Sequence, residues 1–319
     1  AARRLWPVFA GGLLVVLPWL ARNYLELGSP FPGQAVDNLF LVENEDIFAF
    51  REHPDAATYL AQGAATVLTN PLRAVVDNFT SVILLPAFPV GIAGLISLVG
   101  LWRSPALRRP TALTAVLMCS VLIFVSTMVL FPVATLWGTF MHSSGPLLVG
   151  LGVMAALGGD ALMARISRLR AWDRPNVMIA PIALVSITFL FTVFQVRTFG
   201  LASNETEARF ETLAASLAAT AEAAGQELPA TFITDRPMWL AGTTERYALA
   251  LPDEDIESIL ELGDAFGTRW LLVVDERGRY PDVLLDPANR ACLVAEPTSL
   301  QAPGGDAWLF LLADECSSA

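Results

Sequence analysis

Four polar residues lie at the ends of long apolar runs, where a membrane surface would place them beside lipid head groups. Arg22 and Asn23 close the first run within PWLARNYLELGSPFP (18–32), and His142 and Ser143 lie within WGTFMHSSGP (137–146). A guanidinium group can bind phosphate through two parallel hydrogen bonds, and imidazole and hydroxyl groups also donate to anions. One interpretation is a site for a lipid-linked phosphate. The alternative is an interface anchor at Arg22 and a capped turn at His142, with no ligand.

A cluster of carboxylates follows in the segment 43–55, namely Glu43, Glu45, Asp46, Glu52 and Asp55. Hard cations prefer oxygen ligands, so this group could bind a divalent cation or a sugar, but a solvated loop surface is the interpretation that the sequence favours.

The two histidines lack partners at the spacing of a zinc site, and the motifs of soluble hydrolases and nucleotide-binding enzymes are missing from the sequence. The sequence therefore indicates no metal site and no cofactor.

Long apolar runs must position these groups. Five runs approach or reach the roughly 20 residues that a helix needs to cross a bilayer, at about 5–21, 81–102, 111–131, 145–164 and 177–196. Nine arginines lie before the first run, between the second and third, and between the fourth and fifth, whereas the loops on the opposite side carry only Arg22, Arg51 and Arg73. The positive-inside rule predicts a cytoplasmic N-terminus, with the loop 22–80 and the C-terminal tail outside.

The outer loop and the tail are predicted to carry structure of their own. Asn70-Pro71 resembles a helix start, and an amphipathic helix over about 71–80 would lie on the membrane surface or pack on protein. The tail, 201–319, indicates an α/β domain with helices at 204–225 and 253–266 and strands at 230–235, 269–276, 291–296 and 307–313. The fold class is therefore a polytopic α-helical membrane protein of about five transmembrane helices with a C-terminal extracytoplasmic α/β domain.

Residues 197–319 are acidic, with 21 Asp and Glu residues against 8 arginines, which argues against nucleic acid as a partner of the tail. Cys292 and Cys316 lie near its last two predicted strands and could form a disulfide in an oxidising compartment. The sequence leaves that pairing open, because it does not show how close the two residues come.

Three segments resemble bacterial membrane glycosyltransferases of the GT-C class, the relatives of the protein mannosyltransferases and of the aminoarabinose transferases. PWLARNYLELGSPFP is similar to their P-W-x-x-R-N-x-x-x-x-G-x-P-F segment, GTFMHSSGPLLVGLGVMAALG to their F-x-H-S loop and following span, and ITDRPMWLAGTTERYALALP with FGTRWLLVVD to their outer domain. The resemblance implies transfer of a sugar from a polyprenyl-phosphate donor to an acceptor on the outer face of a bacterial plasma membrane.

Such enzymes carry a catalytic carboxylate in an outer loop after their first span, and no residue of this chain matches that motif in position. We therefore expect a C-terminal portion that contains no catalytic residue, in which Arg22, Asn23, His142 and Ser143 are candidates for binding donor phosphate. The alternative is a non-enzymatic membrane protein whose acidic outer domain binds a partner. A transporter is disfavoured, since Asp160 is the only acidic residue within the five predicted spans.

Overall fold

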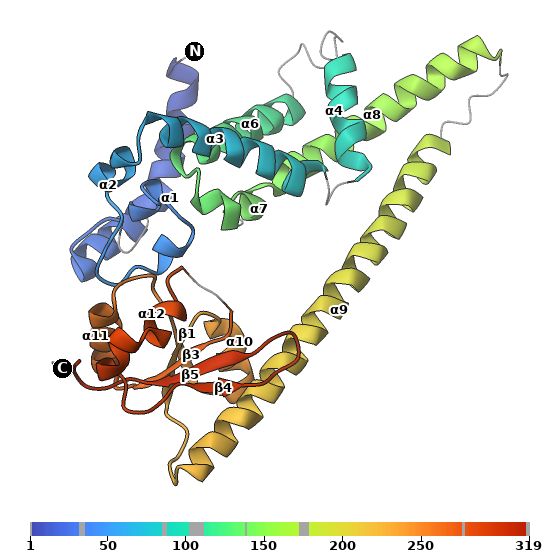
Figure 1. The fold of residues 1–319 in the computed structure, drawn as a ribbon. Helices are drawn as coiled ribbons and strands as arrows, with labels where there is room; N and C mark the ends of the chain where they lie inside the picture. The colour runs from blue at the N-terminus through green and yellow to red at the C-terminus, as the bar shows by residue number, and fades with distance from the viewer. Residues whose placement is uncertain are drawn as a thin grey trace.

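The computed structural model describes residues 2–31, 36–84, 88–101, 112–137, 139–171, 179–275 and 278–316. Apolar helices form the first part, and a small sheet covered by helices forms the second (Figure 1). The helices of the first part are α1 (Ala2–Leu27), α2 (Ala56–Ala61), α3 (Ala64–Asn78), α4 (Val90–Leu101), α6 (Ala112–Leu130), α7 (Thr139–Ser143) and α8 (Gly145–Leu169). Short 3-10 turns lie at Asp37–Leu39, Glu45–Phe48 and Ala134–Trp137, and a π-helical turn lies at Phe79–Leu84.

Within the described residues, three helices are long and apolar enough to cross a membrane: Leu113–Leu130, Gly145–Leu169 and Ile182–Ala223. The predicted span 81–102 is not one helix, because α4 has only 12 residues and begins directly after Pro89. A proline offers no backbone N–H and restricts the residue before it, so the helix starts afresh there. Part of that predicted span, 85–87, lies outside the described residues.

Helices α4 and α8 pack backbone against backbone. A Cβ atom on Gly94 of α4 would overlap the carbonyl group of Leu151, and one on Gly158 of α8 would overlap the side chain of Ser97. Small residues allow apolar helices to approach this closely, which brings many atoms of the two helices into contact.

Helix α9 (Ile179–Ala223) joins the two parts as one rod of 45 residues, which corresponds to about 68 Å. Its length exceeds the roughly 30 Å of a hydrocarbon core, so its second half must project beyond any membrane that its first half crosses. That second half buries Phe210, Leu213 and Leu217 against the sheet. The predicted helix 204–225 is therefore the end of the last predicted span, continued without a break.

The sheet has five strands in the order β2-β1-β3-β5-β4. β1 pairs in parallel with β2 and β3, whereas β5 runs antiparallel to β3 and β4. Helices α9 and α10 cover one face, and α11, α12 and a 3-10 turn cover the other. The bounds are β1 (Thr231–Thr234), α10 (Pro237–Thr244), β2 (Tyr247–Ala250), α11 (Ile256–Phe266), β3 (Trp270–Val273), α12 (Asp282–Leu285), the 3-10 turn (Pro287–Cys292), β4 (Thr298–Leu300) and β5 (Ala307–Leu311).

Two local predictions were wrong. Asn70-Pro71 does not start a helix, because α3 begins seven residues earlier, after Gly63 at φ +89°, and carries Pro71 in its interior. The predicted strand 291–296 is a 3-10 turn followed by one isolated bridge between Leu293 and Leu312. Strand β2 and helix α10 were not predicted, because eight helical and four extended residues are too few for a clear hydrophobic period.

Candidate functional site

The end of α1 carries the first pair of predicted residues. The Arg22 side chain is exposed and pairs with Glu26 one turn later, at 3.0 Å between Nε and Oε2. Asn23 is 7% exposed, and its Nδ2 donates to the carbonyl of Pro30 at 3.4 Å, which closes the chain reversal after the helix. Gly28, at φ +71°, permits that reversal. Asn23 thus has a local structural partner, and Arg22 has an exposed one.

The second predicted pair lies on the short helix α7. His142 is exposed in its last turn, and the Ser143 hydroxyl donates to the carbonyl of Phe140 at 3.1 Å. Phe140 is buried and packs edge-on against Phe124 of α6, which fixes α7 on the helical part. The two pairs therefore lie on different elements, and their role in binding a phosphate stays a prediction.

A polar cavity of about 320 Å³ lies beside the end of α6, and we call it the loop pocket. The loop between α1 and α2, helix α3 and the turn after α6 form its walls. The lining residues are Val42, Glu43, Asn44, Glu45, Asn70, Arg73, Pro132 and Val133. Two carboxylates, two amides and one guanidinium group therefore surround a single cavity.

Local bonds shape the loop that carries the pocket's carboxylates. Asp46 accepts hydrogen bonds from the backbone N–H groups of Val42 and Glu43 at 2.8 and 2.9 Å. This turns the Asp46 side chain toward its own backbone and leaves Glu43 and Glu45 along the cavity. Leu41 is 2% exposed and packs with Val133 beneath the loop.

A buried polar contact fixes the other two walls relative to each other. The Nδ2 of Asn78, at the end of α3, donates to Thr135 Oγ1 at 3.1 Å, and both residues are buried. Next to Arg73, Ala74 is fully buried against the helical core, so α3 is anchored along this side. Arg73 itself is exposed, with Asp77 at 3.5 Å.

These groups suit a ligand that is rich in hydroxyl groups. Carboxylates accept hydrogen bonds from hydroxyls, a guanidinium group donates to them, and amides do both. No group of three or more His, Cys, Asp or Glu residues in the described parts of the chain is arranged to bind a metal ion, and this includes the predicted acidic cluster. The loop pocket is therefore a candidate site for a sugar.

The α/β domain holds the loop between α1 and α2 through one buried carboxylate. Glu254, which follows β2, is 2% exposed, and its Oε1 accepts hydrogen bonds from the N–H groups of Phe50, Arg51 and Glu52 at 2.6, 2.8 and 3.0 Å. Phe50 packs against the core beneath α11, and the Arg51 guanidinium forms an ion pair with Glu261. We call this contact the Glu254 clamp. It couples the loop that lines the pocket to the domain.

A second polar cluster lies at the carboxyl ends of the parallel strands. Asp235 follows β1 and accepts hydrogen bonds from the N–H groups of Val274 and Asp275, at 2.8 and 2.9 Å. Burial raises the pKa of Asp235 above its usual value, against the effect of these two hydrogen bonds. Asp275 forms ion pairs with Arg209 and Arg236 at 2.9 and 2.8 Å. Burial acts to raise the pKa of Asp275, but the two arginines outweigh it, and its pKa lies below the usual value.

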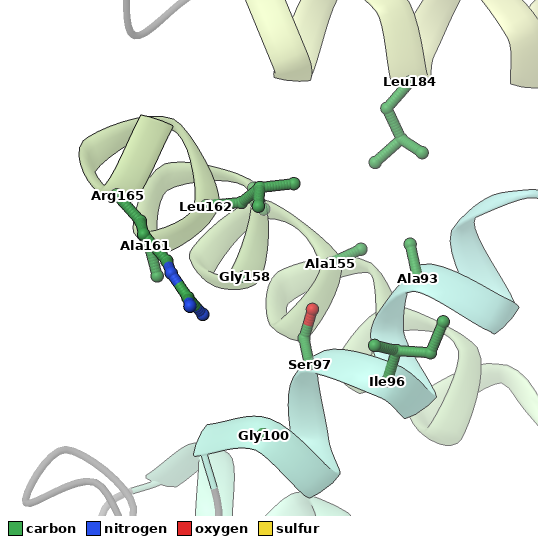
Figure 2. Close-up of a pocket in the computed structure, with 12 residues that line it drawn as sticks. Ala93, Ile96, Ser97, Gly100, Ala155, Gly158, Ala161, Leu162, Arg165 and Leu184 are labelled. Carbon is green, nitrogen blue, oxygen red and sulfur yellow. The ribbon is translucent and has the colours of Figure 1, made fainter. Parts of the chain in front are cut away.

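The largest cavity that we describe, about 590 Å³, lies between α4, α8 and the start of α9. Figure 2 shows Leu184 reaching from α9 toward Ala93 and Ile96 of α4, with Arg165 of α8 at one end. Its lining is mostly glycine, alanine and aliphatic side chains, with Ser97 the polar residue between the helices. The cavity can hold an apolar chain but offers little for chemistry.

The structure joins Cys292 and Cys316 in a disulfide, which ties the C-terminal segment to the turn after α12.

Sequence reasoning missed the Glu254 clamp and the strand-end cluster. The aspartates in ITD and VVD, each just after a strand, were the available signal for the strand-end cluster, because parallel strands bring their carboxyl ends to one edge of the sheet.

Comparison with family models, with curated proteins and with solved structures found no match.

Proposed function

We propose that this chain is the C-terminal portion of a membrane glycosyltransferase that moves a sugar from a polyprenyl-phosphate donor to an acceptor on the outer face of the membrane. The observation that carries the proposal is the loop pocket, where Glu43, Glu45 and Arg73 meet at the end of apolar helices. A sugar that is presented at a membrane surface needs such a set of hydrogen-bonding groups close to the lipid.

The proposed topology has five spans, of which the second is interrupted before α4, a cytoplasmic N-terminus, and the loop and tail outside. The distribution of arginines supports it, and so does the surface of α3. Leu68, Leu72 and Val76 follow one another at four-residue spacing on that helix and are 74, 64 and 56% exposed. An apolar stripe of this kind suits a helix that lies in the membrane interface.

A lipid phosphate that leaves at the membrane surface requires a nearby cation. Arg73 lies in the loop pocket, next to the apolar stripe, and we propose that it binds the donor phosphate there. Arg22, which the sequence suggested for this role, is the second candidate, and both side chains are exposed. The proposal assigns no general base to the described residues.

The test is transfer of a labelled sugar by the full-length protein in native membranes. Arg73→Ala and Glu45→Gln should each raise the KM for the polyprenyl-phosphate sugar about tenfold or more, because each removes a charged partner of the bound donor. Arg22→Ala should weaken use of the donor without lowering expression. Asp77→Asn is the control, since Asp77 contacts Arg73 but does not line the cavity. Unchanged KM and kcat in both pocket variants would remove the loop pocket from the mechanism.

A partner-binding role for the domain is the second candidate, and one observation favours it. Met238 and Trp239 of α10 are 86 and 37% exposed and line one cavity on the surface of the domain. Large exposed apolar side chains that gather on one face often mark an interaction surface. If this role is the main one, Met238→Asp should abolish co-purification of a partner, and the pocket variants should have no effect on it.

A further inference from the structure

We propose that the α/β domain carries a binding site for one neutral sugar residue, distinct from the loop pocket, in a cavity at the membrane-facing end of β3 and β5. The cavity measures about 250 Å³. Its polar and aromatic walls are Arg209, Asp275, Asp306 and Trp308, and the Gly304-Gly305 turn closes it.

The topology places this cavity where α/β domains bind ligands. The chain leaves β1 toward α10, on the face that α9 covers, but it leaves β3 toward α12, on the opposite face. Adjacent parallel strands whose connections diverge in this way leave a crevice at their carboxyl ends. Asp235 fills the part between β1 and β3, where it binds the two backbone N–H groups after β3, so the open space lies on the β5 side of Asp275.

The carboxyl ends of the strands point back toward the apolar helices. Arg209 reaches the carbonyl of Val274 at the end of β3, although it lies 14 residues before the far end of α9 at Ala223. The strands therefore run antiparallel to α9. From Arg197, at the end of the apolar part of that helix, to Arg209 the rise is about 18 Å. A lipid phosphate in the head-group layer does not extend that far, whereas a glycan that projects from the surface does.

Hydrogen bonds within the protein hold the polar walls in place. Arg209 donates to Asp275 at 2.9 Å, to the Val274 carbonyl at 3.0 Å and to the Gly305 carbonyl at 3.4 Å. Its Nε is buried and has no acceptor among the described residues. Asp275 keeps acceptor capacity beyond its two arginine partners, because a carboxylate offers about four lone-pair sites.

Charge and shape both favour a neutral sugar over an anion. Arg209 and Arg236 balance Asp275 and Asp306, so the cluster presents no net positive charge to a phosphate. Trp308 is partly buried and adds a flat apolar wall against which the C–H face of a sugar ring can stack. Carboxylates and a guanidinium group beside an aromatic ring supply hydrogen bonds to the hydroxyl groups at the ring's edge.

The bound sugar would belong to the acceptor, and that identification rests on the proposed function, whereas binding itself does not. Residues 1–319 in phospholipid nanodiscs are probed by saturation-transfer NMR with glucose, mannose, galactose and arabinose in turn. The expected result is transfer to at least one sugar, with a Kd of about 1 mM or weaker, as befits a single ring in a small open site.

Two variants and a control locate the site. Asp306→Asn changes an exposed residue, and Trp308→Leu removes the stacking wall; each should weaken sugar binding about tenfold. Trp239→Phe, whose ring stacks on Phe210 outside the cavity, should have no effect. The inference is overturned if the folded wild type binds none of the four sugars, if both variants bind like wild type, or if inorganic phosphate displaces the sugar. Because the assay involves no turnover, each of these results leaves the transferase proposal to its own test.

Discussion

The Glu254 clamp gives the sharpest prediction about how the two parts of the chain are coupled. Three backbone N–H groups converge on one carboxylate oxygen that is shielded from solvent. A hydrogen bond to a charged group contributes about 1.5–3 kcal/mol, and three bonds that share one oxygen contribute less than their sum. We therefore expect Glu254→Ala to weaken docking of the loop by about 3–5 kcal/mol.

Glu254→Gln separates charge from geometry. All three N–H groups bond to Oε1 at 3.0 Å or less, so an amide oxygen at that position can keep these contacts without the negative charge. The amide NH2 group would replace Oε2, which accepts a further hydrogen bond from the Arg51 N–H at 3.1 Å, and that bond would be lost. Neutral hydrogen bonds are about half as strong, so this variant should lie between wild type and Glu254→Ala. Glu261→Ala is the matched control, because its ion pair with Arg51 is about half exposed and contributes about 1 kcal/mol or less.

The assay is hydrogen exchange of the amides of residues 50–52 in lipid nanodiscs. If the free energy of docking the loop on the domain falls by about 3 kcal/mol, these amides should exchange about 100-fold faster, provided that they exchange when the loop undocks. The expected order of exchange rates is wild type, Glu261→Ala, Glu254→Gln and Glu254→Ala, from slowest to fastest. Equal protection in wild type and Glu254→Ala would refute the reasoning, because the carboxylate would then not hold the loop.

Three further predictions concern stability. Gly94→Ala should lower the free energy of unfolding of the helical part by about 1–3 kcal/mol, because the added Cβ meets the backbone of α8. Gly100→Ala on the same helix is the control, because its Cβ meets nothing within 4 Å. Equal thermal stability of the two variants would contradict this prediction. Asp255 caps α11, and the hydrogen bond from the Ser258 N–H lowers the pKa of the Asp255 carboxyl in the folded protein. The stabilisation that the cap gives to the folded state is therefore present above the usual aspartate pKa, and it is lost as the pH falls through the lower pKa of the folded state. Asp255→Ala should therefore cost about 1 kcal/mol at pH 7 in chemical denaturation and progressively less in acid, and a cost that does not change with pH would contradict this. Replacing Cys292 and Cys316 together by serine should cost about 3 kcal/mol, given the 24-residue separation, and an unchanged midpoint of unfolding in denaturant would argue against the bond.

The sequence predicted those elements whose apolar runs are continuous. The apolar runs 111–131 and 145–164 became α6 and α8 because they are too long for strands, and 269–276 became β3 because a short continuous apolar run is typical of a strand buried on both faces. Short elements such as β2 were missed, since tertiary pairing stabilises them more than their own sequence does.

The polar sites could be predicted only in part. The acidic loop was noticed in the sequence, but its neighbour Arg73 comes from a helix some 30 residues later, and no local pattern links the two. Glu254 is separated from the loop it binds by about 200 residues. Its carboxylate looks like one of many on an acidic surface until the fold buries it against three N–H groups.

The measurement that tests the central claim most directly is release of polyprenyl phosphate by the full-length protein in proteoliposomes supplied with a polyprenyl-phosphate sugar and a membrane acceptor. We predict that labelled sugar appears on the acceptor at the rate at which polyprenyl phosphate is released, and that Arg73→Ala slows both equally while Asp77→Asn slows neither. Absence of transfer from every polyprenyl-phosphate sugar supplied, with a protein that remains folded and inserted, would contradict the account.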